Sequence, residues 1–122
     1  LNQVIEDERA ARADDGVWEA CSIYERHNGA LFAQALRESD ESESGEVVHV
    51  HQPQGSLHAH LSAVDARIVI ERGWGELHGL SGNGRIPDYY TFLYFPRDDA
   101  EVEALRSIVR AALDHAVGLR AS

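Results

Sequence analysis

The sequence predicts one α+β domain, in which a small, mainly antiparallel sheet with a histidine-rich β-hairpin packs against two or three helices. Three patterns support this fold class: two alternating runs between residues 46 and 61, an aromatic run at 89–95 and a helical pattern at 98–117. The chain has 122 residues, about the size of one domain, and such a chain buries most of its apolar surface without disulfides or metal ions. One compact unit is therefore expected.

The first 45 residues are the least regular part and are expected to be an N-terminal segment of the same domain, whose main part is residues 46–122. Residues 1–13 could form a helix, and residues 21–26 fit a helix or an edge strand equally, because their apolar spacing matches neither period. Residues 38–45 are acidic residues and serines with one glycine. This run is too polar to pack and is expected to be a solvated loop.

A β-hairpin is predicted where the alternating residues 46–51 and 57–61 flank a turn-forming cluster at 53–56. If the chain turns symmetrically on Gln54 and Gly55, the two sequence numbers in each pair of facing residues add up to 109. Side chains alternate between the two faces of a strand, so the histidines of both strands would share one face.

In this register His51 pairs with His58 and His49 pairs with His60, with directly opposed Cβ atoms about 5 Å apart. Neutral imidazole binds divalent zinc, iron, copper or nickel, so His49, His51, His58 and His60 are a predicted metal site with open positions left for substrate or dioxygen. The same side chains suit acid–base chemistry near neutral pH. A third interpretation is that they are partly buried polar or solvent-facing residues without a site.

The next elements are a short helix and a strand. Ser62 with Asp65 three residues later is typical of a helix start, and Gly73 is expected to end this helix, which would span about 63–72. Residues 89–95 are rich in aromatic and branched side chains and precede Pro96, so they predict a strand with much of both faces covered.

The last helix is the clearest element of the sequence. Asp98 as N-cap with Glu101 three residues later forms a capping box, and Gly118 is expected to be a left-handed C-cap residue. Apolar residues recur at helical spacing between these ends, at Val102, Leu105, Val109, Ala112 and Ala116. A helix over 98–117 that packs one face on the sheet is therefore predicted.

Composition narrows the classes of partner. The net charge is −10 and all 11 basic residues are arginines, so nucleic-acid binding is disfavoured. Cys21 is the single cysteine, which excludes an internal disulfide and a cysteine-based zinc knuckle. No apolar run reaches the roughly 20 residues of a membrane span. We therefore expect a cytoplasmic protein, monomer or homodimer, with a small-molecule ligand and no nucleic-acid or membrane partner.

Several blocks occur in a fixed order along the second part of the chain. The most specific are Gly73-Trp74-Gly75 followed by His78, and Thr91-Phe92-Leu93-Tyr94 followed by Pro96 and Arg97. In these blocks and in the histidine hairpin the chain resembles the fungal luciferases and their small prokaryotic relatives, over about 70 residues. The first 45 residues match poorly, His60 stands where the fungal proteins carry an aliphatic residue, and Gly79 replaces a proline.

The resemblance implies a luciferase-like small oxygenase. Fungal luciferases oxidise 3-hydroxyhispidin with dioxygen through a peroxidic intermediate that loses carbon dioxide, and they need no added organic cofactor. For this chain the resemblance therefore implies an enolic or aromatic small-molecule substrate and no organic cofactor, although a divalent metal could be present. The implied catalytic residues are His49, His51, His58 and His78.

Oxidation of an electron-rich enol needs a base, donors that stabilise the enolate, and an apolar wall that excludes water. The hairpin histidines could supply the first two. Trp74 could supply the wall or act as a core anchor, and Arg97 could bind an enolate or pair with Asp98 or Glu101. We place Trp74, Tyr94 and Arg97 in the substrate site. The alternative function is a non-catalytic metal- or small-ligand-binding module.

Overall fold

The computed structural model describes residues 2–23, 29–39, 41–42, 44–51, 56–77 and 89–119, with Asn2 and His51 described by their backbone alone. These residues form a sheet in the order β1-β2-β3-β4-β6-β5, in which every neighbouring pair is antiparallel. The strands are β1 (Val17–Cys21), β2 (Gly29–Ala33), β3 (Glu46–His51), β4 (Ser56–His60), β5 (Gly75–Leu77) and β6 (Tyr90–Leu93). The predicted α+β class with an antiparallel sheet and a histidine hairpin is confirmed.

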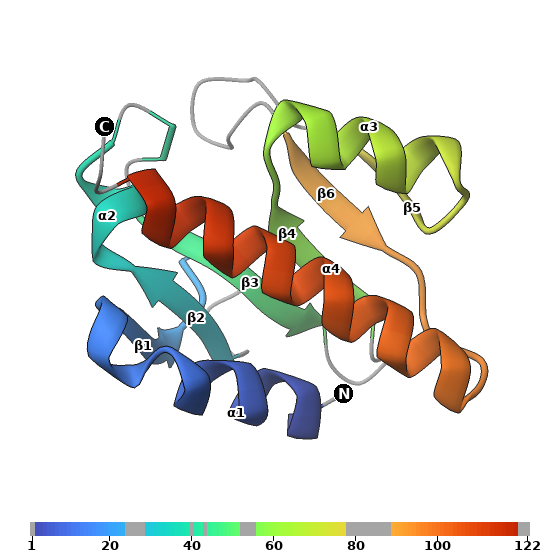
Figure 1. Cartoon of the computed structure of the whole chain (residues 1–122), viewed down its shortest axis with the longest axis horizontal. Helices are drawn as coiled ribbons and strands as arrows, with labels where there is room; N and C mark the ends of the chain where they lie inside the picture. The colour runs from blue at the N-terminus through green and yellow to red at the C-terminus, as the bar shows by residue number, and fades with distance from the viewer. Residues whose placement is uncertain are drawn as a thin grey trace.

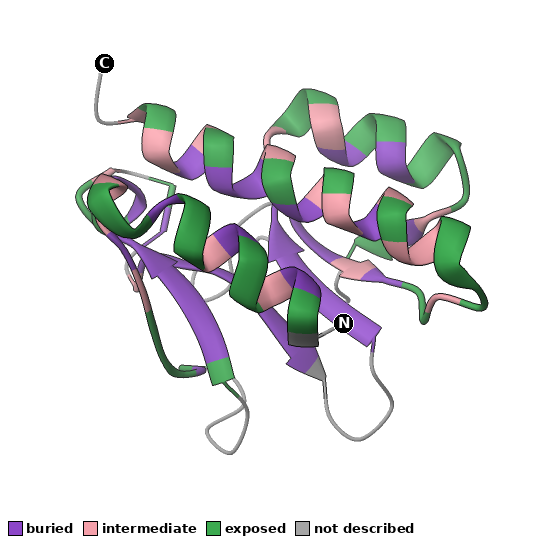
Figure 2. Cartoon of the chain, turned by 60° about the horizontal axis from the view of Figure 1, so that its bottom comes forward, coloured by how far each residue is buried: buried purple, intermediate pink, exposed green. Residues whose placement is uncertain are grey.

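The helices are gathered on one side of this sheet (Figures 1 and 2). They are α1 (Asn2–Ala11), α2 (Gln34–Arg37), α3 (Ala63–Glu71) and α4 (Asp99–Gly118), with one 3-10 turn, η1 (Ala13–Asp15). The longest of them, α4, crosses the middle of the sheet, α1 lies beside it, and α3 lies near β5. This arrangement leaves the opposite face of the sheet without a helix among the residues that the structure describes.

Two helix starts predicted from the sequence are confirmed by their capping bonds. The side chain of Ser62 accepts a hydrogen bond from the Asp65 amide at 3.1 Å, and that of Asp98 accepts one from the Glu101 amide at 2.9 Å. Gly73 has a φ of 79° and follows the end of α3, as expected. The C-cap prediction for Gly118 is wrong, since α4 continues through Gly118 and Leu119 is the right-handed C-cap residue.

The core lies between α4 and the face of the sheet that α4 covers. Leu105, Val109, Ala112 and Leu113 of α4 are at most 1% exposed and pack with alternate residues of β3 and β4, namely Val48, Val50, Leu57 and Ala59. Because side chains alternate along a strand, the intervening residues His49 and His58 point to the other face. The hydrophobic pattern thus determines which face carries the imidazoles.

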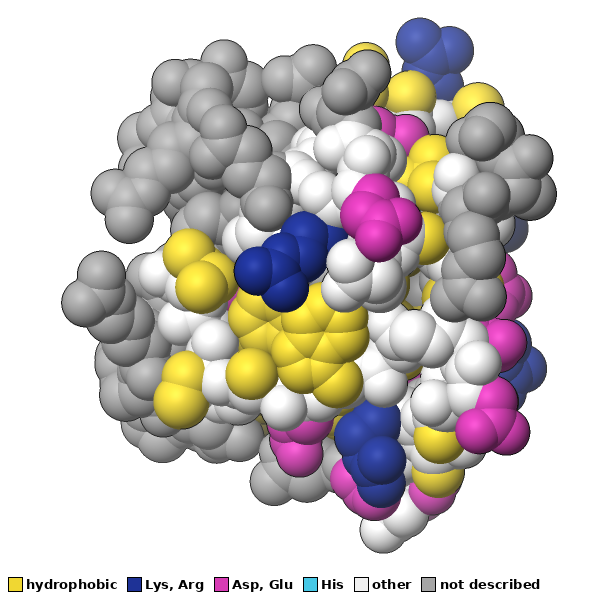
Figure 3. All heavy atoms as spheres, turned by 90° about the vertical axis from the view of Figure 1, so that its left-hand side faces the viewer, with side chains coloured by type: hydrophobic (Ala, Val, Ile, Leu, Met, Phe, Trp, Pro, Cys, Tyr) yellow, Lys and Arg dark blue, Asp and Glu magenta, His cyan; other side chains and the backbone are white. Residues whose placement is uncertain are grey.

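The N-terminal segment adds two strands to this sheet rather than standing apart from it. β2 pairs with β3, and β1 pairs with β2 as an edge strand, which includes Cys21. Trp18 and Phe32 stack across these strands with ring centroids 5.6 Å apart. Figure 3 shows the side of the molecule that carries β1, where arginine and acidic side chains border the apolar ones. Glu19 is an exposed acid in the middle of β1, and a charge on an edge strand limits its pairing with other chains.

The prediction of a solvated loop at residues 38–45 is wrong for Ser42 and Gly45, which are buried, whereas Glu38 and Glu41 are exposed. Ser42 is only 6% exposed, and its hydroxyl accepts a hydrogen bond from the Gly45 amide at 3.2 Å. The Glu41 carboxylate contacts two histidine rings on other elements. Serine side chains that bond to nearby backbone, together with histidine partners for the acid, let this polar run pack against the fold.

Candidate functional site

The strands of the histidine hairpin pair in a different register from the predicted one, because the centre of the turn lies one residue earlier in the sequence. His49 faces His58, and His51 faces Ser56, so the paired residue numbers sum to 107. The predicted pairs of His51 with His58 and of His49 with His60 are therefore wrong, because four residues rather than two connect the last pair. Like the predicted sum, this sum is odd, so odd-numbered residues of β3 still face even-numbered residues of β4. The histidine positions therefore stay on the same face of the sheet.

A bulge in β3 brings an acidic residue onto the histidine face. Leu31 of β2 faces Val48, but the next residue, Phe32, faces Glu46, so β3 contains one extra residue at this point. In a regular strand, positions 46 and 49 would point to opposite faces. The bulge lets the Glu46 carboxylate contact the ring of His49, with 2.8 Å between Oε2 and Nδ1.

The Glu46 carboxylate is fully buried and accepts hydrogen bonds from four groups. Oε1 accepts from the Ser22 hydroxyl at 2.9 Å and from the Ile23 amide at 2.7 Å. Oε2 accepts from the Tyr90 hydroxyl at 3.1 Å and lies beside Nδ1 of His49. A buried carboxylate needs such partners to offset its desolvation, and these donors hold it in one orientation.

The contact with Glu46 selects the tautomer of His49. A carboxylate oxygen can only accept, so Nδ1 of His49 carries the proton and the lone pair of the neutral ring is on Nε2. The Tyr90 oxygen also lies 2.9 Å from Nδ1, which further restricts the rotation of the ring. A carboxylate-oriented imidazole with its lone pair on Nε2 is the arrangement that proteins use for a general base or a metal ligand.

His49 is the first of a row of rings on the sheet face opposite the helices. The ring centroids of His49 and His58 are 4.7 Å apart. Those of His58 and Phe92 are 5.3 Å apart, and those of Phe92 and Tyr94 are 5.9 Å apart. His49 and His58 are 1% and 6% exposed, so water has little access to either ring. Chemically, the row joins a buried pair of imidazoles to an aromatic surface.

The predicted substrate residues Trp74, Tyr94 and Arg97 line one pocket of about 330 Å³, together with Phe95 and Glu101. Trp74 also packs against the core, so it serves both as a pocket wall and as an anchor. Arg97 is paired with Glu101 at 2.6 Å and is 83% exposed, and this hydrogen bond lowers the pKa of Glu101. Partial burial and the neighbouring Glu76 carboxylate raise the pKa of the Tyr94 hydroxyl.

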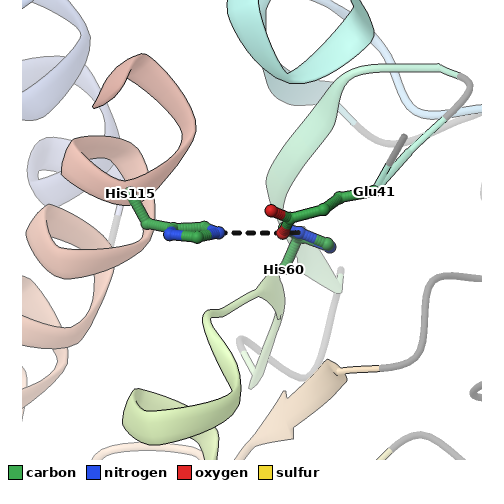
Figure 4. Close-up of side chains that lie close together, drawn as sticks. All are labelled: Glu41, His60 and His115. Atoms are coloured by element: carbon green, nitrogen blue, oxygen red, sulfur yellow. Dashed lines mark hydrogen bonds and ion pairs between the residues drawn. The ribbon is translucent and has the colours of Figure 1, made fainter. Parts of the chain in front are cut away.

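His60 belongs to a second group of side chains (Figure 4). Its Nε2 lies 3.1 Å from Oε1 of Glu41, and Nε2 of His115 on α4 lies 2.8 Å from the same oxygen. Burial lowers the pKa of His60 and outweighs the contact with Glu41, which acts in the opposite direction. Burial acts to raise the pKa of Glu41, but the hydrogen bonds from His115 and His60 lower it overall.

The structure thus divides the predicted histidine set. His49 and His58 lie in ring contact, whereas the ring of His60 stacks against His115 at 6.1 Å. Within the described residues, Glu41, His60 and His115 bring three ligand atoms within 4.8 Å of one another, and His49, His58 and His60 do not form such a group. The side chain of His51 and the whole of His78 lie outside the described residues.

Sequence reasoning missed Glu46, Tyr90, Glu41 and His115. Glu46 is three residues from His49, a spacing that indicates nothing on a strand without knowledge of the bulge. Tyr90 lies within the predicted strand 89–95, but the sequence did not indicate that this strand would pair with β4 and bring the Tyr90 hydroxyl to the histidines. His115 was visible as a histidine on the last helix, but its contact partner is 74 positions away in the chain.

The residues that form β3, β4, α3, β5, β6 and most of α4 match a known protein family in sequence. The model of the Luciferase domain family matches residues 44–112, which is more than half of the chain. The protein therefore belongs to the Luciferase domain family.

The chain is similar in sequence to luciferases from fungi. The luciferase of Neonothopanus nambi is 37% identical over 73 residues, and that of Armillaria gallica is 34% identical over 73 residues. Each match covers 57% of this chain but 27% of the fungal protein, so the chain spans about a quarter of the length of these relatives.

No solved structure matches the chain. In the part of the chain that the structure describes, no helix is long and apolar enough to cross a membrane.

Proposed function

We propose that this protein is a small luciferase-like oxygenase that oxidises an enolic or aromatic small molecule with dioxygen. The observation that carries the proposal is the buried network of Glu46, His49 and Tyr90, with His58 in ring contact with His49. Family membership supports the same class of reaction, because matched relatives are named luciferases.

In the proposed reaction the imidazole pair removes a proton from the enol hydroxyl of the substrate. Glu46 does not touch the substrate; it holds the His49 ring and stabilises the imidazolium that forms. The enolate carbon is then oxidised by two electrons as a carbon–oxygen bond forms to dioxygen, which is reduced to the peroxide level. The imidazolium returns its proton to the terminal peroxide oxygen, so protons and electrons balance.

The surroundings of the pair suit this chemistry in two respects. Both imidazoles are nearly inaccessible to water, which protects a peroxide from side reactions. The rings of Phe92 and Tyr94 extend the row from His58 and offer a surface on which a planar aromatic substrate can stack. We expect the substrate to bind along this row, with Trp74 and Arg97 at its outer end.

Oxygen uptake tests the proposal. An oxygen electrode would follow purified protein with 3-hydroxyhispidin and with a panel of hydroxypyrones and catechols, in parallel with the His49→Gln and Arg106→Gln variants. Arg106 of α4 forms ion pairs with Asp7, Glu8 and Glu103, none of which belongs to the site, so its substitution controls for a charge change elsewhere on the molecule. We expect uptake with at least one enolic substrate that is lost in His49→Gln and retained in Arg106→Gln.

The alternative of a non-catalytic binding module predicts a different result. Such a module would bind a member of the panel, measured by calorimetry, without any consumption of dioxygen. Binding without uptake across the whole panel would therefore replace the oxygenase proposal with the binding module.

A further inference from the structure

The Glu41–His60–His115 cluster lies outside the chemistry proposed above and joins three segments that are distant in the sequence. Glu41 precedes β3, His60 ends β4 and His115 is in the last turns of α4. Glu41 and His115 also fall outside residues 44–112, which are the residues that the family model matches. From this geometry we infer that the cluster is a binding site for one divalent transition-metal ion of the zinc type.

The donor set fits such an ion. Two imidazole nitrogens and one carboxylate oxygen are ligands that zinc accepts, and three protein ligands leave a fourth position for water. Both Nε2 atoms point at the same oxygen of Glu41, at 3.1 Å from His60 and 2.8 Å from His115 (Figure 4). All three ligand atoms lie within 4.8 Å of one another.

The spacing needs little adjustment to admit an ion. Bonds of about 2.0–2.1 Å in a tetrahedron keep neighbouring ligand atoms about 3.3 Å apart. The two nitrogen–oxygen separations would lengthen by a few tenths of an ångström, and the two nitrogens, which now lie within 4.8 Å of each other, would take about the same separation. The Glu41 side chain is 39% exposed and that of His115 is 23% exposed, so both can move and an ion can enter from solvent.

The environment of His60 also favours the role of a ligand. Its side chain is 3% exposed, and its Nδ1 has no hydrogen-bond partner among the described residues, so the polar contact of this ring is made on the Nε2 side. The acidic run at residues 38–43 and the net charge of −10 raise the local concentration of cations.

A bound ion would fasten the loop before β3 to the end of α4. Because Glu46 follows Glu41 by five positions, the ion would also restrict the start of the strand that carries His49. The site is therefore expected to act on stability and order of the loop. It requires no part of the oxygenase proposal, and its test needs no substrate.

The test is titration of chelator-treated protein with Zn²⁺ by calorimetry, and with Co²⁺ by visible absorption, which reports the coordination geometry. The variants are Glu41→Gln and His115→Gln, whose side chains are exposed enough to be replaced without loss of the fold. Glu38→Gln is the matched control, since it removes the same charge from the same loop while its partner Gln34 lies outside the cluster.

We expect one equivalent of metal to bind the unchanged protein and Glu38→Gln, with at least about tenfold weaker binding in both cluster variants. Free Zn²⁺ at about 100 times its Kd should raise the Tm of the unchanged protein by roughly 10 °C. Absence of stoichiometric binding, or binding that survives unweakened in either cluster variant, would overturn the assignment. Binding lost only when His49 or His58 is replaced would also overturn it.

Discussion

Replacement of Glu46 by glutamine tests whether the carboxylate that the bulge of β3 brings to His49 prepares this histidine to act as the general base. The glutamine amide has the size of the carboxylate but presents one acceptor and one donor. The Ile23 amide, which bonds to Oε1 at 2.7 Å, is fixed in the backbone and can only donate, so the amide oxygen must stay on that side. The NH₂ group then faces Nδ1 of His49 and the hydroxyl of Tyr90.

This substitution should reverse the tautomer of His49. A donor opposite Nδ1 favours the ring with its proton on Nε2, which removes the lone pair that the proposed reaction uses. General-base catalysis contributes about 10²–10⁴ in rate, so we expect kcat/KM to fall by that factor. All four hydrogen bonds of Glu46 lose the charge of the acceptor, and after the smaller desolvation cost of the amide the net loss is about 2–3 kcal/mol of folding free energy. The Tm should fall by roughly 10 °C.

Two assays separate the tautomer from a general loss of structure. The ¹⁵N shifts of the His49 ring, measured well below the Tm, report which nitrogen carries the proton in each protein. Glu76→Gln is the matched control, because Glu76 also accepts a hydrogen bond from a tyrosine, Tyr94 at 3.3 Å, but on the surface. It should change stability by less than about 0.5 kcal/mol. An unchanged His49 tautomer in Glu46→Gln, or an unchanged rate, would refute this reasoning.

Three further predictions concern stability. Burial lowers the pKa of His60 below 6.5, so His60 binds a proton at a higher pH in the unfolded chain than in the folded protein. The free energy of unfolding of chelator-treated protein, measured in urea, should therefore decrease as the pH falls below about 6.5. The same pH dependence of stability in His60→Gln would contradict this. Asp98→Ala removes the N-cap of α4 and should cost about 1 kcal/mol in urea unfolding, with Asp99→Ala as the nearly neutral control. Leu113→Ala, at a fully buried position, should cost about 2–5 kcal/mol, and a loss below 1 kcal/mol would show that this position is not packed as described.

The parts of the fold that depend on local patterns were predictable from the sequence. The capping residues Ser62 and Asp98 gave the starts of α3 and α4 because an N-cap is a contact between residues three positions apart. The face that carries His49 and His58 followed from strand alternation. The end of α4 was not predictable from Gly118, because a glycine also tolerates a helical conformation when the helix continues.

The contacts that form the candidate site are longer in range, and this explains why they were missed. The hairpin register depends on the length of its turn, and the sequence 53–56 fits more than one turn. The pairing of Glu46 with His49 depends on a bulge set by the neighbouring strand β2, which belongs to the least regular part of the sequence. The contact of Glu41 with His115 depends on where α4 crosses the sheet, and no local pattern specifies that position.

In the proposed reaction, the imidazole pair promotes formation of a carbon–oxygen bond to dioxygen. The most direct measurement is mass spectrometry of the product formed from 3-hydroxyhispidin, or from the best substrate of the panel, under ¹⁸O₂ in ordinary water. We predict ¹⁸O in the organic product of the unchanged protein and no product above background with His49→Gln. A product that contains oxygen from water alone, or equal labelling with and without His49, would contradict the proposed reaction.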